Sequence, residues 1–513
     1  MKKSLFVAIV VSLGGFLFGF DAGIISGVMA YAGPEFSLND IQNGWAVSAP
    51  TFAAMLSMLV AGRLSDIIGR KKILIVVALL YALSAVLSAY ATGYHILWIA
   101  RFVGGIAFGA ALILAPTYIA EISTPESRGK LVSVQQLNIV LGFFAAFLSN
   151  YYFNKAFTSG ESTLLTDENV WRWMLGVEFF PAIIYFVLLF FIPRSPRWLF
   201  TKNKNEEAKR ILVAIHGEKQ AEKEVESVIN NISTASFPEG KVKLGDLFKP
   251  AMKFVLTVGI IIGVLQQITG INAIYFYATS IFKQTGIGTD AAFSSGVLLS
   301  FTTVVFTIVA MLLIDRMGRR PLLLFGIAGI AMSLLLCSYG FNNATYELND
   351  EAIAKFEFSE KNQLSPLSGK IYDSDVEFKN ALKEALGNQG YLDNEGVIIE
   401  SAITMNATLV LIGILGFIAC FAFSLGPVMW VLLSELFPNR YRGLAIGFVA
   451  FINSFASWIV QFIFPWELSN LGNSMSFGIF GVIALIGFFI FLKILPETKG
   501  KSLEQIEKEL VKA

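Results

Sequence analysis

The chain has 513 residues, of which 55% are hydrophobic and only 15% are charged. Soluble domains carry roughly 25% charged residues, so this composition favours a protein that folds in lipid. The net charge of +1 argues against a nucleic-acid partner, and two cysteines in apolar runs with only two histidines argue against a disulfide framework or a metal site.

The amino terminus could be read as a secretory signal, because Lys2 and Lys3 precede an apolar run that ends near a cleavage-like Ala30-Tyr31-Ala32. The apolar core of a signal spans about 7–15 residues. The run here is longer and is interrupted by Asp21. We therefore expect a first transmembrane helix.

Apolar stretches long enough to cross a membrane recur along the chain. A spanning helix needs about 20 mostly apolar residues. The sequence predicts an all-α membrane protein with twelve such helices, in two sets of six: 6–30, 44–64, 72–92, 96–119, 130–153 and 174–193, then 252–282, 291–314, 320–341, 405–434, 442–465 and 474–495.

Basic residues lie in alternate loops, which indicates the orientation. If the amino terminus is inside, the short inner loops hold Arg63, Arg70, Lys71, Lys72, Arg128, Lys130, Arg316, Arg319, Arg320, Arg440 and Arg442. The loops on the opposite side are poor in Lys and Arg. The positive-inside rule then places both termini in the cytoplasm of a multi-pass protein of the cell (inner or plasma) membrane.

The spans define four parts of the chain. Residues 1–193 form an amino-terminal six-helix bundle, and 251–495 form a carboxy-terminal one. Between them, residues 194–250 are rich in Lys and Glu with helical spacing and are expected to form a cytoplasmic helical linker. Residues 496–513 form a cytoplasmic tail.

Short motifs repeat between the two halves, which indicates a duplicated six-helix unit. Asp66 stands four residues before Arg70, and Asp315 stands four before Arg319, at an offset of 249 (315 − 66). Glu121 precedes Arg128 by seven residues, as Glu435 precedes Arg442, but at an offset of 314 (435 − 121). Repeats of this kind place a substrate near mid-membrane.

The offset between equivalent motifs of the two halves increases by 65 residues (314 − 249). This increase matches the length of a polar stretch, 342–404, in the second half. It holds twelve Asp and Glu against five Lys, a net charge of −7. We interpret it as an extracellular insertion with a small, partly helical cap around 375–387. The simpler interpretation is a solvated loop without a role in transport.

The repeated acidic and basic residues suit a cytoplasmic switch. Such pairs form when the inner side closes and separate when it opens, either across the halves or with a glutamate at a neighbouring helix end. The alternative is that each positive charge only sets topology. The candidate gate residues are Asp66, Arg70, Glu121, Arg128, Asp315, Arg319, Glu435 and Arg442.

Four motifs resemble those of the sugar porter family of the major facilitator superfamily. They are Gly69-Arg70-Lys71, Pro193-Arg194-Ser195-Pro196-Arg197-Trp198-Leu199, Gln266-Gln267 through Gly270-Ile271-Asn272, and Pro496-Glu497-Thr498-Lys499-Gly500. The family usually carries Glu where this chain has Arg194, which puts one cytoplasmic ion pair of the family in doubt. The resemblance implies the major facilitator fold.

Asp21 is an ionisable residue inside the first predicted span. A charge at that depth costs about 2.5–3.5 kcal/mol on insertion scales and is a functional candidate by default. It is similar to the helix-1 carboxylate of bacterial xylose–proton symporters, and the resemblance implies Arg101 as its partner and Glu178 as a second carboxylate that tunes it. The alternative is a static structural ion pair.

Side-chain amides can both donate to and accept from sugar hydroxyls. The resemblance implies that hydroxyls are bound by Gln136, Gln266, Gln267, Asn272 and Asn453, with Phe18, Phe421 and Trp430 beside Gly426 as an aromatic wall. In a chain with 46 Phe, an aromatic residue more often packs in the apolar core than binds a ligand. This weakens the assignment of Phe18 and Phe421 to the sugar site.

Two departures from the family leave the choice between hexose and pentose open. Phe276 stands where many relatives have the first Tyr of a pair, and Ser454 stands where several have Trp.

These patterns together predict a proton-coupled monosaccharide symporter that works by alternating access, as a monomer without a cofactor. A sugar uniporter that works by the same cycle is the nearest alternative. A membrane sugar sensor is a more distant one, because only residues 496–513 follow the last span. An enzyme is not expected, since the intramembrane residues include no nucleophile–base or metal constellation.

Overall fold

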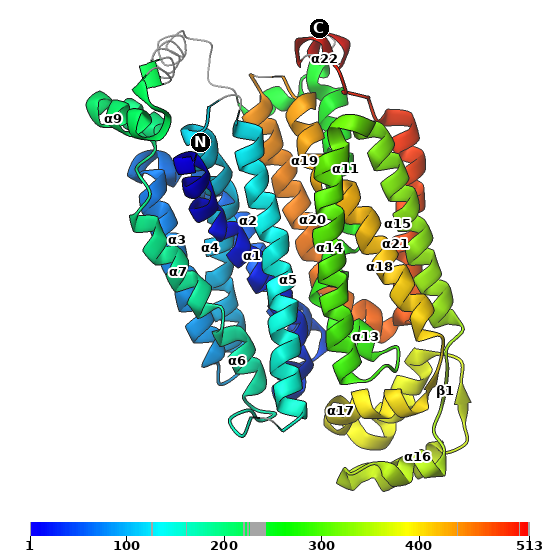
Figure 1. The fold of residues 1–513 in the computed structure, drawn as a ribbon. Helices are drawn as coiled ribbons and strands as arrows, with labels where there is room; N and C mark the ends of the chain where they lie inside the picture. The colour runs from blue at the N-terminus through cyan, green and yellow to red at the C-terminus, as the bar shows by residue number, and fades with distance from the viewer. Residues whose placement is uncertain are drawn as a thin grey trace. The chain divides into compact units, whose positions relative to one another are not determined.

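The computed structural model describes residues 2–124, 127–160, 162–218, 221–222, 225, 243–438, 440–501 and 503–510. Nearly all of the regular structure in these ranges is helical (Figure 1). In the first half of the chain the helices are α1 (Lys2–Glu35), α2 (Asp40–Ile68), α3 (Arg70–Ala89), α4 (Tyr94–Ile122), α5 (Arg128–Thr158), α6 (Val170–Gly176), α7 (Phe179–Phe190), α8 (Pro196–Thr201) and α9 (Asn205–His216).

The second half begins with two short 3-10 turns and continues with long helices. The elements are η1 (Leu244–Phe248), η2 (Pro250–Met252), α11 (Lys253–Ile268), α12 (Ile271–Phe276), α13 (Ala278–Lys283), α14 (Thr289–Met317), α15 (Arg319–Asn342), α18 (Ala407–Phe423), α19 (Leu425–Leu436), α20 (Arg442–Asn470), α21 (Gly472–Ile494) and α22 (Leu503–Leu510). The predicted linker keeps α8 and α9; much of its remainder, residues 226–242, lies outside the described residues.

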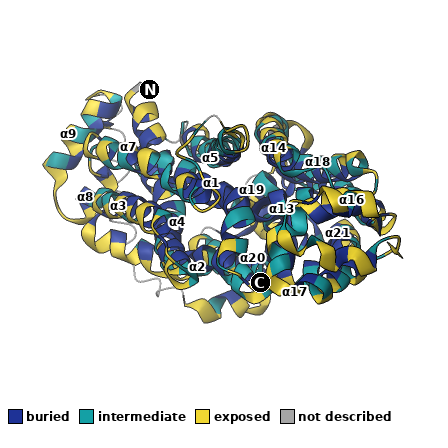
Figure 2. Ribbon diagram, turned by 90° about the horizontal axis from the view of Figure 1, so that it is seen from below, coloured by how far each residue is buried: buried dark blue, intermediate teal, exposed yellow. Residues whose placement is uncertain are grey.

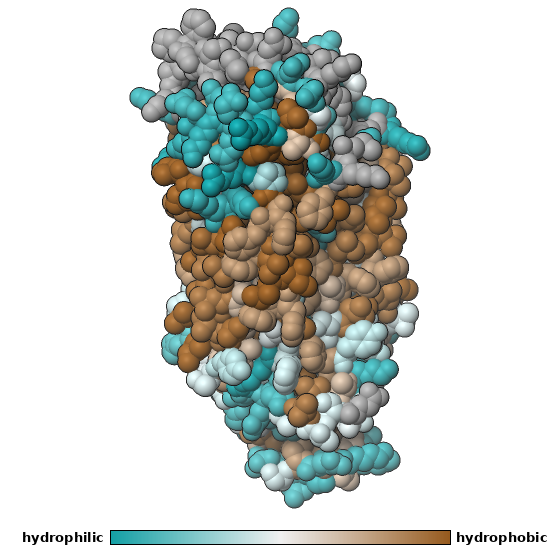
Figure 3. Space-filling model, turned by 60° about the vertical axis from the view of Figure 1, so that its left-hand side comes forward, coloured by the Kyte–Doolittle hydropathy of each residue, from teal (hydrophilic) through white to brown (hydrophobic). Residues whose placement is uncertain are grey.

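Twelve helical stretches of the described chain are long and apolar enough to cross a membrane, which confirms the predicted number of spans. The face drawn in Figure 3 carries hydrophobic side chains across its middle and hydrophilic ones toward its two ends. Such a band is the surface that a bilayer requires, because lipid offers no partner to polar groups.

The chain forms two compact units. The first comprises residues 1–21, 49–143 and 175–243, and the second comprises 22–48, 144–174 and 244–513. In the first, α3 packs against α4 and α7; in the second, α15 packs against α18 and α21, and α11 packs against α20. The helices direct their buried residues toward these neighbours and carry exposed residues on their outer sides (Figure 2).

Three of the predicted spans are interrupted where site residues lie, and the sixth breaks between α6 and α7, next to Glu178. The seventh breaks after α11 at Gly270, whose φ of +87° belongs to the left-handed region. Only glycine adopts this conformation without strain, and a Cβ there would also press on the ring of Phe480. The tenth span breaks at Ser424, between α18 and α19. Each break turns the following residues relative to the preceding helix.

The predicted insertion is a folded element, which we call the cap and define as residues 343–406. It comprises β1 (Thr345–Glu347), α16 (Asp350–Lys355), η3 (Ser359–Leu367), β2 (Ile371–Tyr372), α17 (Asp375–Ala402) and β3 (Ile403–Thr404). The three strands form an antiparallel sheet in the order β2-β1-β3. Tyr346 and Phe378 stack at 5.3 Å in its buried core.

Candidate functional site

Asp21 on α1 and Arg101 on α4 form an ion pair inside the first unit. The nitrogen–oxygen distance is 3.3 Å, and a second hydrogen bond measures 3.5 Å. Asp21 is 3% exposed and Arg101 is 2% exposed. The charges of Asp21 and Arg101 compensate each other at a depth where an unpaired charge costs several kcal/mol. The pairing that the resemblance implied is therefore present.

Small residues let α3 and α4 pack closely beside this pair. Gly104 lies one turn beyond Arg101 on α4, and a Cβ at that position would lie 2.6 Å from the hydroxyl of Ser84. Ser84 itself donates to the carbonyl of Ala100 at 2.9 Å. The α3–α4 contact is thus close enough to shield the carboxylate of Asp21 from lipid.

Glu178, just before α7, adds a second carboxyl group to this buried site. Its exposure is 2%, and it lies within electrostatic reach of Asp21 and Arg101. Two carboxylates cannot both ionise at low cost beside one guanidinium. Protonation of one carboxyl group therefore depends on the other, which is the arrangement expected of a proton-binding site.

Amide side chains from α11 and α20 form a connected cluster in the second unit. The Gln267 amide nitrogen donates to Oε1 of Gln266 and to Oδ1 of Asn453, both at 3.2 Å. Asn453 donates in turn to Oε1 of Gln266 at 2.8 Å. All three side chains are buried at 4–7% exposure.

The cluster continues along α20 and across the break in the seventh span. Asn272 on α12 donates to Oε1 of Gln267 at 2.9 Å and to the hydroxyl of Ser457 at 2.6 Å. Gln461 donates to the same hydroxyl at 2.7 Å. Ser457 and Gln461 were not among the predicted site residues. Their spacing of four and eight residues from Asn453 could have indicated them, because such residues share one helix face.

Backbone carbonyls just after the break in the tenth span also bond to this cluster. The Gln266 amide nitrogen donates to the carbonyl of Leu425 at 2.9 Å and to that of Gly426 at 3.5 Å. Phe421 is 9% exposed and lies against Gly426, whereas Trp430 on α19 is 40% exposed. Of these two predicted wall residues of the second unit, Trp430 therefore presents the more accessible ring.

The two remaining predicted sugar-binding residues belong to the first unit. Phe18 packs against Phe108 with ring centroids 4.9 Å apart, so its ring is part of the local apolar core. Gln136 is half-buried on α5. Its neighbour Gln135 is 3% exposed, and its Oε1 has no hydrogen-bond partner among the described residues.

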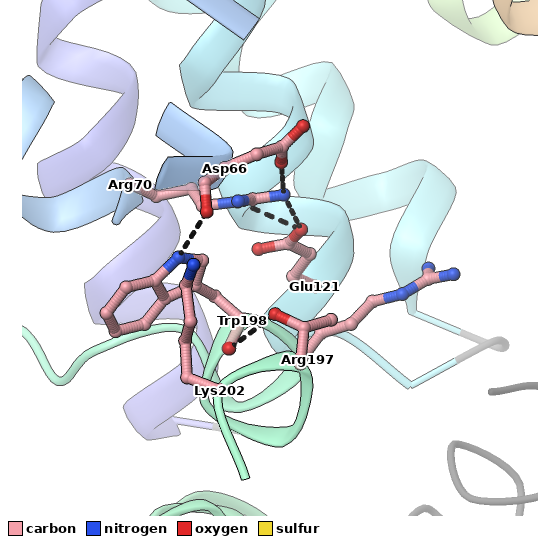
Figure 4. A pocket seen from close by; sticks show the side chains of 7 residues that line it. Asp66, Arg70, Glu121, Arg197, Trp198 and Lys202 are labelled. Carbon is pink, nitrogen blue, oxygen red and sulfur yellow. Dashed lines mark hydrogen bonds and ion pairs between the residues drawn. The ribbon is translucent and has the colours of Figure 1, made fainter. Parts of the chain in front are cut away.

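The gate residues of the first unit form an ion-paired cluster at the end that faces the linker (Figure 4). Arg70 lies 2.7 Å from Asp66 and 3.0 Å from Glu121. Trp198 donates to the backbone of Asp66 at 3.0 Å. Glu121 also accepts from the hydroxyl of Ser195. A pocket of about 390 Å³ is lined by Asp66, Arg70, Glu121, Arg197, Trp198, Thr201 and Lys202.

The second unit repeats this arrangement. Arg319 pairs with Glu435 at 2.8 Å, and Glu435 accepts from the hydroxyl of Thr498 at 2.6 Å. The gate charges were expected to pair either across the halves or with a glutamate at a neighbouring helix end. The described contacts match the second kind of pairing. Arg442 donates to the carbonyl of Phe437 at 3.1 Å. The side chains of Arg128 and Asp315 lie outside the described residues.

The two clusters differ at one position. In the second unit, Glu497 accepts from the backbone nitrogens of Arg319 and Arg320 at 3.2 and 3.1 Å and so caps α15. Pro193-Arg194-Ser195 matches Pro496-Glu497-Thr498, so Arg194 stands in the place of that cap. Arg194 pairs instead with Glu207 on α9 at 3.4 Å, with side chains that are 46% and 41% exposed.

We predict that Arg194→Glu stabilises the protein by about 1 kcal/mol, the usual contribution of a helix cap and its favourable dipole interaction. The lost pair with Glu207 is exposed and contributes little. Thermal unfolding in detergent measures the change. Glu497→Gln is the matched control and is expected to lower the unfolding temperature. A lower stability of Arg194→Glu would contradict the equivalence of the two positions.

Comparisons with known proteins cover almost the whole chain. A family model described as "Sugar (and other) transporter" matches residues 7–356 and 394–510. The arabinose-proton symporter of Bacillus subtilis is 33% identical over 98% of this chain and 93% of its own. The D-xylose-proton symporter of Escherichia coli is 28% identical over 98% of this chain and 94% of its own.

A solved structure agrees with these relatives. The xylose transporter XylE from Escherichia coli, in a partially occluded inward-open conformation, superposes with a TM-score of 0.74 at 25% identity, over 98% of this chain and 100% of that one.

Proposed function

This chain belongs to the sugar transporter family of the major facilitator superfamily, and on that premise we propose that it carries a monosaccharide and protons together across the cell membrane. The observation that carries the proposal is the buried pair of Asp21 and Arg101. Two of the relatives are named proton symporters, and the alignment with this chain covers 93–94% of the length of each. A uniporter would not need an ionisable group at this depth.

Proton coupling follows from the chemistry of the pair. Ionised Asp21 holds Arg101, and protonated Asp21 releases it, so the two protonation states favour different packing of α1 against α4. Glu178 lies within electrostatic reach of both and adjusts the pH at which the exchange takes place. A proton thereby biases which conformation the transporter adopts.

Sugar binding is assigned to the amide cluster of the second unit. Each sugar hydroxyl both donates and accepts, as does each side-chain amide. Gln266, Gln267 and Asn453 satisfy one another in the structure, so they are not left unpaired when the site is empty. When a sugar binds, its hydroxyl groups replace these contacts between amides, so the net change in free energy is small. A small change suits rapid release.

The two linker-side clusters are assigned to the conformational switch. Arg70 and Arg319 are each held by a glutamate that also accepts from a hydroxyl group. A doubled, hydrogen-bonded arrangement of this type has discrete formed and broken states. We assign these two clusters to the cytoplasmic side of the membrane, because the basic loop residues gather there. We assign the cap to the outside.

Transport by the purified protein in sealed vesicles tests this function. Labelled arabinose, xylose, glucose and galactose are supplied with and without an inward proton gradient. We expect at least one sugar to accumulate above equilibrium, and the accumulation to collapse when an ionophore dissipates the gradient. Entry that stops at equilibrium in both conditions would identify a uniporter, and a lack of entry for every sugar would contradict sugar transport.

A further inference from the structure

The cap is joined to the membrane helices through a buried polar cluster on α17. Lys379, which is 4% exposed, donates to Oε1 of Gln284 at 3.3 Å and lies 3.5 Å from Asp375. Asn473, near the start of α21, donates to Gln284 at 2.6 Å and to Asp375 at 2.9 Å. A buried lysine requires such partners, so this contact is part of the folded structure. It fixes α17 to the residue that directly follows α13.

The turn after α13 fits closely against the carboxy-terminal end of the cap. Gly286 and Gly288 have φ values of +75° and +76°. A Cβ on Gly286 would overlap the side chain of Ile403, and one on Gly288 would lie 2.8 Å from Oε1 of Glu400. This turn is therefore enclosed by the cap, and α13 cannot move without the cap or without breaking these contacts.

A second arm of the cap reaches the end of α1. Gln389 donates to the carbonyl of Pro34 at 3.4 Å, and its Oε1 accepts from the hydroxyl of Ser37 at 2.5 Å. Hydrogen bonds thus tie α17 to the end of α1 and, through Gln284, to the residue that follows α13.

The two helices that the cap holds, α1 and α13, also contact each other. Ser26 on α1 accepts from the backbone nitrogen of Thr279 at 2.9 Å, and the two hydroxyl groups lie 3.0 Å apart. Both residues are buried, at 3% and 1% exposure. This contact joins α1 to α13, the short last segment of the broken seventh span.

We propose that the cap is a brace that holds the α1–α13 contact closed and thereby sets how often the cap side opens during transport. Lys379 and Gln389 are its positioning residues. The inference rests on the proposed alternating access, and it revises the expectation that the insertion is a solvated loop. Asp375, Lys379 and Gln389 all lie in 357–393, which falls between the two segments that the family model matches. The brace is therefore an addition to the shared transporter.

Cysteine accessibility tests the brace in the full-length protein. In a background with Cys337→Ala and Cys420→Ala, Ser26→Cys is labelled in intact cells with a membrane-impermeant maleimide. We expect Lys379→Met and Gln389→Ala each to raise the labelling rate about fivefold, the size typical of a coupling between two sites. Lys379→Met leaves Asp375 and Gln284 paired with Asn473, so the cap is expected to remain folded.

The matched control is Lys355→Met, which removes an exposed cap lysine that pairs only with Glu351 among the described residues. It should leave the labelling rate unchanged. Equal rates in the control and both brace variants, with sugar still altering the rate, would overturn the brace and leave transport intact. If no sugar alters the rate in the unmodified background, the proposed function itself fails.

Discussion

Asp21→Asn is expected to abolish proton-driven accumulation of sugar while sugar exchange across the membrane continues. The amide cannot take up a proton, but it can still accept a hydrogen bond from Arg101 in a site of the same volume. Accumulation should fall to the equilibrium level, and exchange of internal for external labelled sugar should stay within about twofold of the unmodified protein. Both rates are measured in the same sealed vesicles.

Glu35→Gln is the matched control, because it neutralises another carboxylate of α1 that bonds to Trp171 and Arg172 at the far end of the helix. It should keep accumulation. Loss of both accumulation and exchange in Asp21→Asn, with the protein still folded, would mean that the pair with Arg101 is only structural.

Gln267→Ala is expected to weaken sugar binding by about tenfold to a hundredfold. Gln267 is connected to Gln266, Asn453 and Asn272, so its loss removes one bond to the sugar and disorders the groups around it. A site built to bind hydroxyls loses about 1–3 kcal/mol when one of its polar partners is left unpaired. Sugar-induced quenching of tryptophan fluorescence or calorimetry measures the affinity.

Trp430→Ala should weaken binding in the same assay, because an accessible aromatic ring is able to pack against the apolar face of a sugar. Gln42→Ala is the control: Gln42 caps the start of α2 through Asn39 and is no part of the amide cluster. Unchanged affinity in both site variants would refute the assignment of the pocket.

Most of the fold could be predicted from hydropathy and charge, because lipid imposes helices of fixed length. The interruptions at Gly270 and Ser424 could not, since a glycine or serine in an apolar run is compatible with an unbroken membrane helix. The compact fold of the cap could not be predicted from the sequence either. Its core depends on contacts such as Tyr346 with Phe378 that the polar composition conceals.

The site could be predicted where one residue was conspicuous by itself. Asp21 stands out as a charge in an apolar helix, and family resemblance supplied Arg101 as its partner. Ser457 is not conspicuous by itself, because a serine on a membrane helix commonly bonds to its own backbone, and only its spacing from Asn453 could have indicated it. Its place between Asn272 and Gln461 depends on how α12 is turned by the break at Gly270.

Proton movement caused by sugar tests proton coupling through Asp21 most directly. Vesicles without any imposed gradient are loaded with a concentrated buffer and suspended in a weakly buffered medium with a pH indicator, and a transported sugar is added. We predict that the medium becomes more alkaline as sugar enters with the unmodified protein, and that it does not with Asp21→Asn. Sugar entry without a pH change in the unmodified protein would contradict the proposed symport.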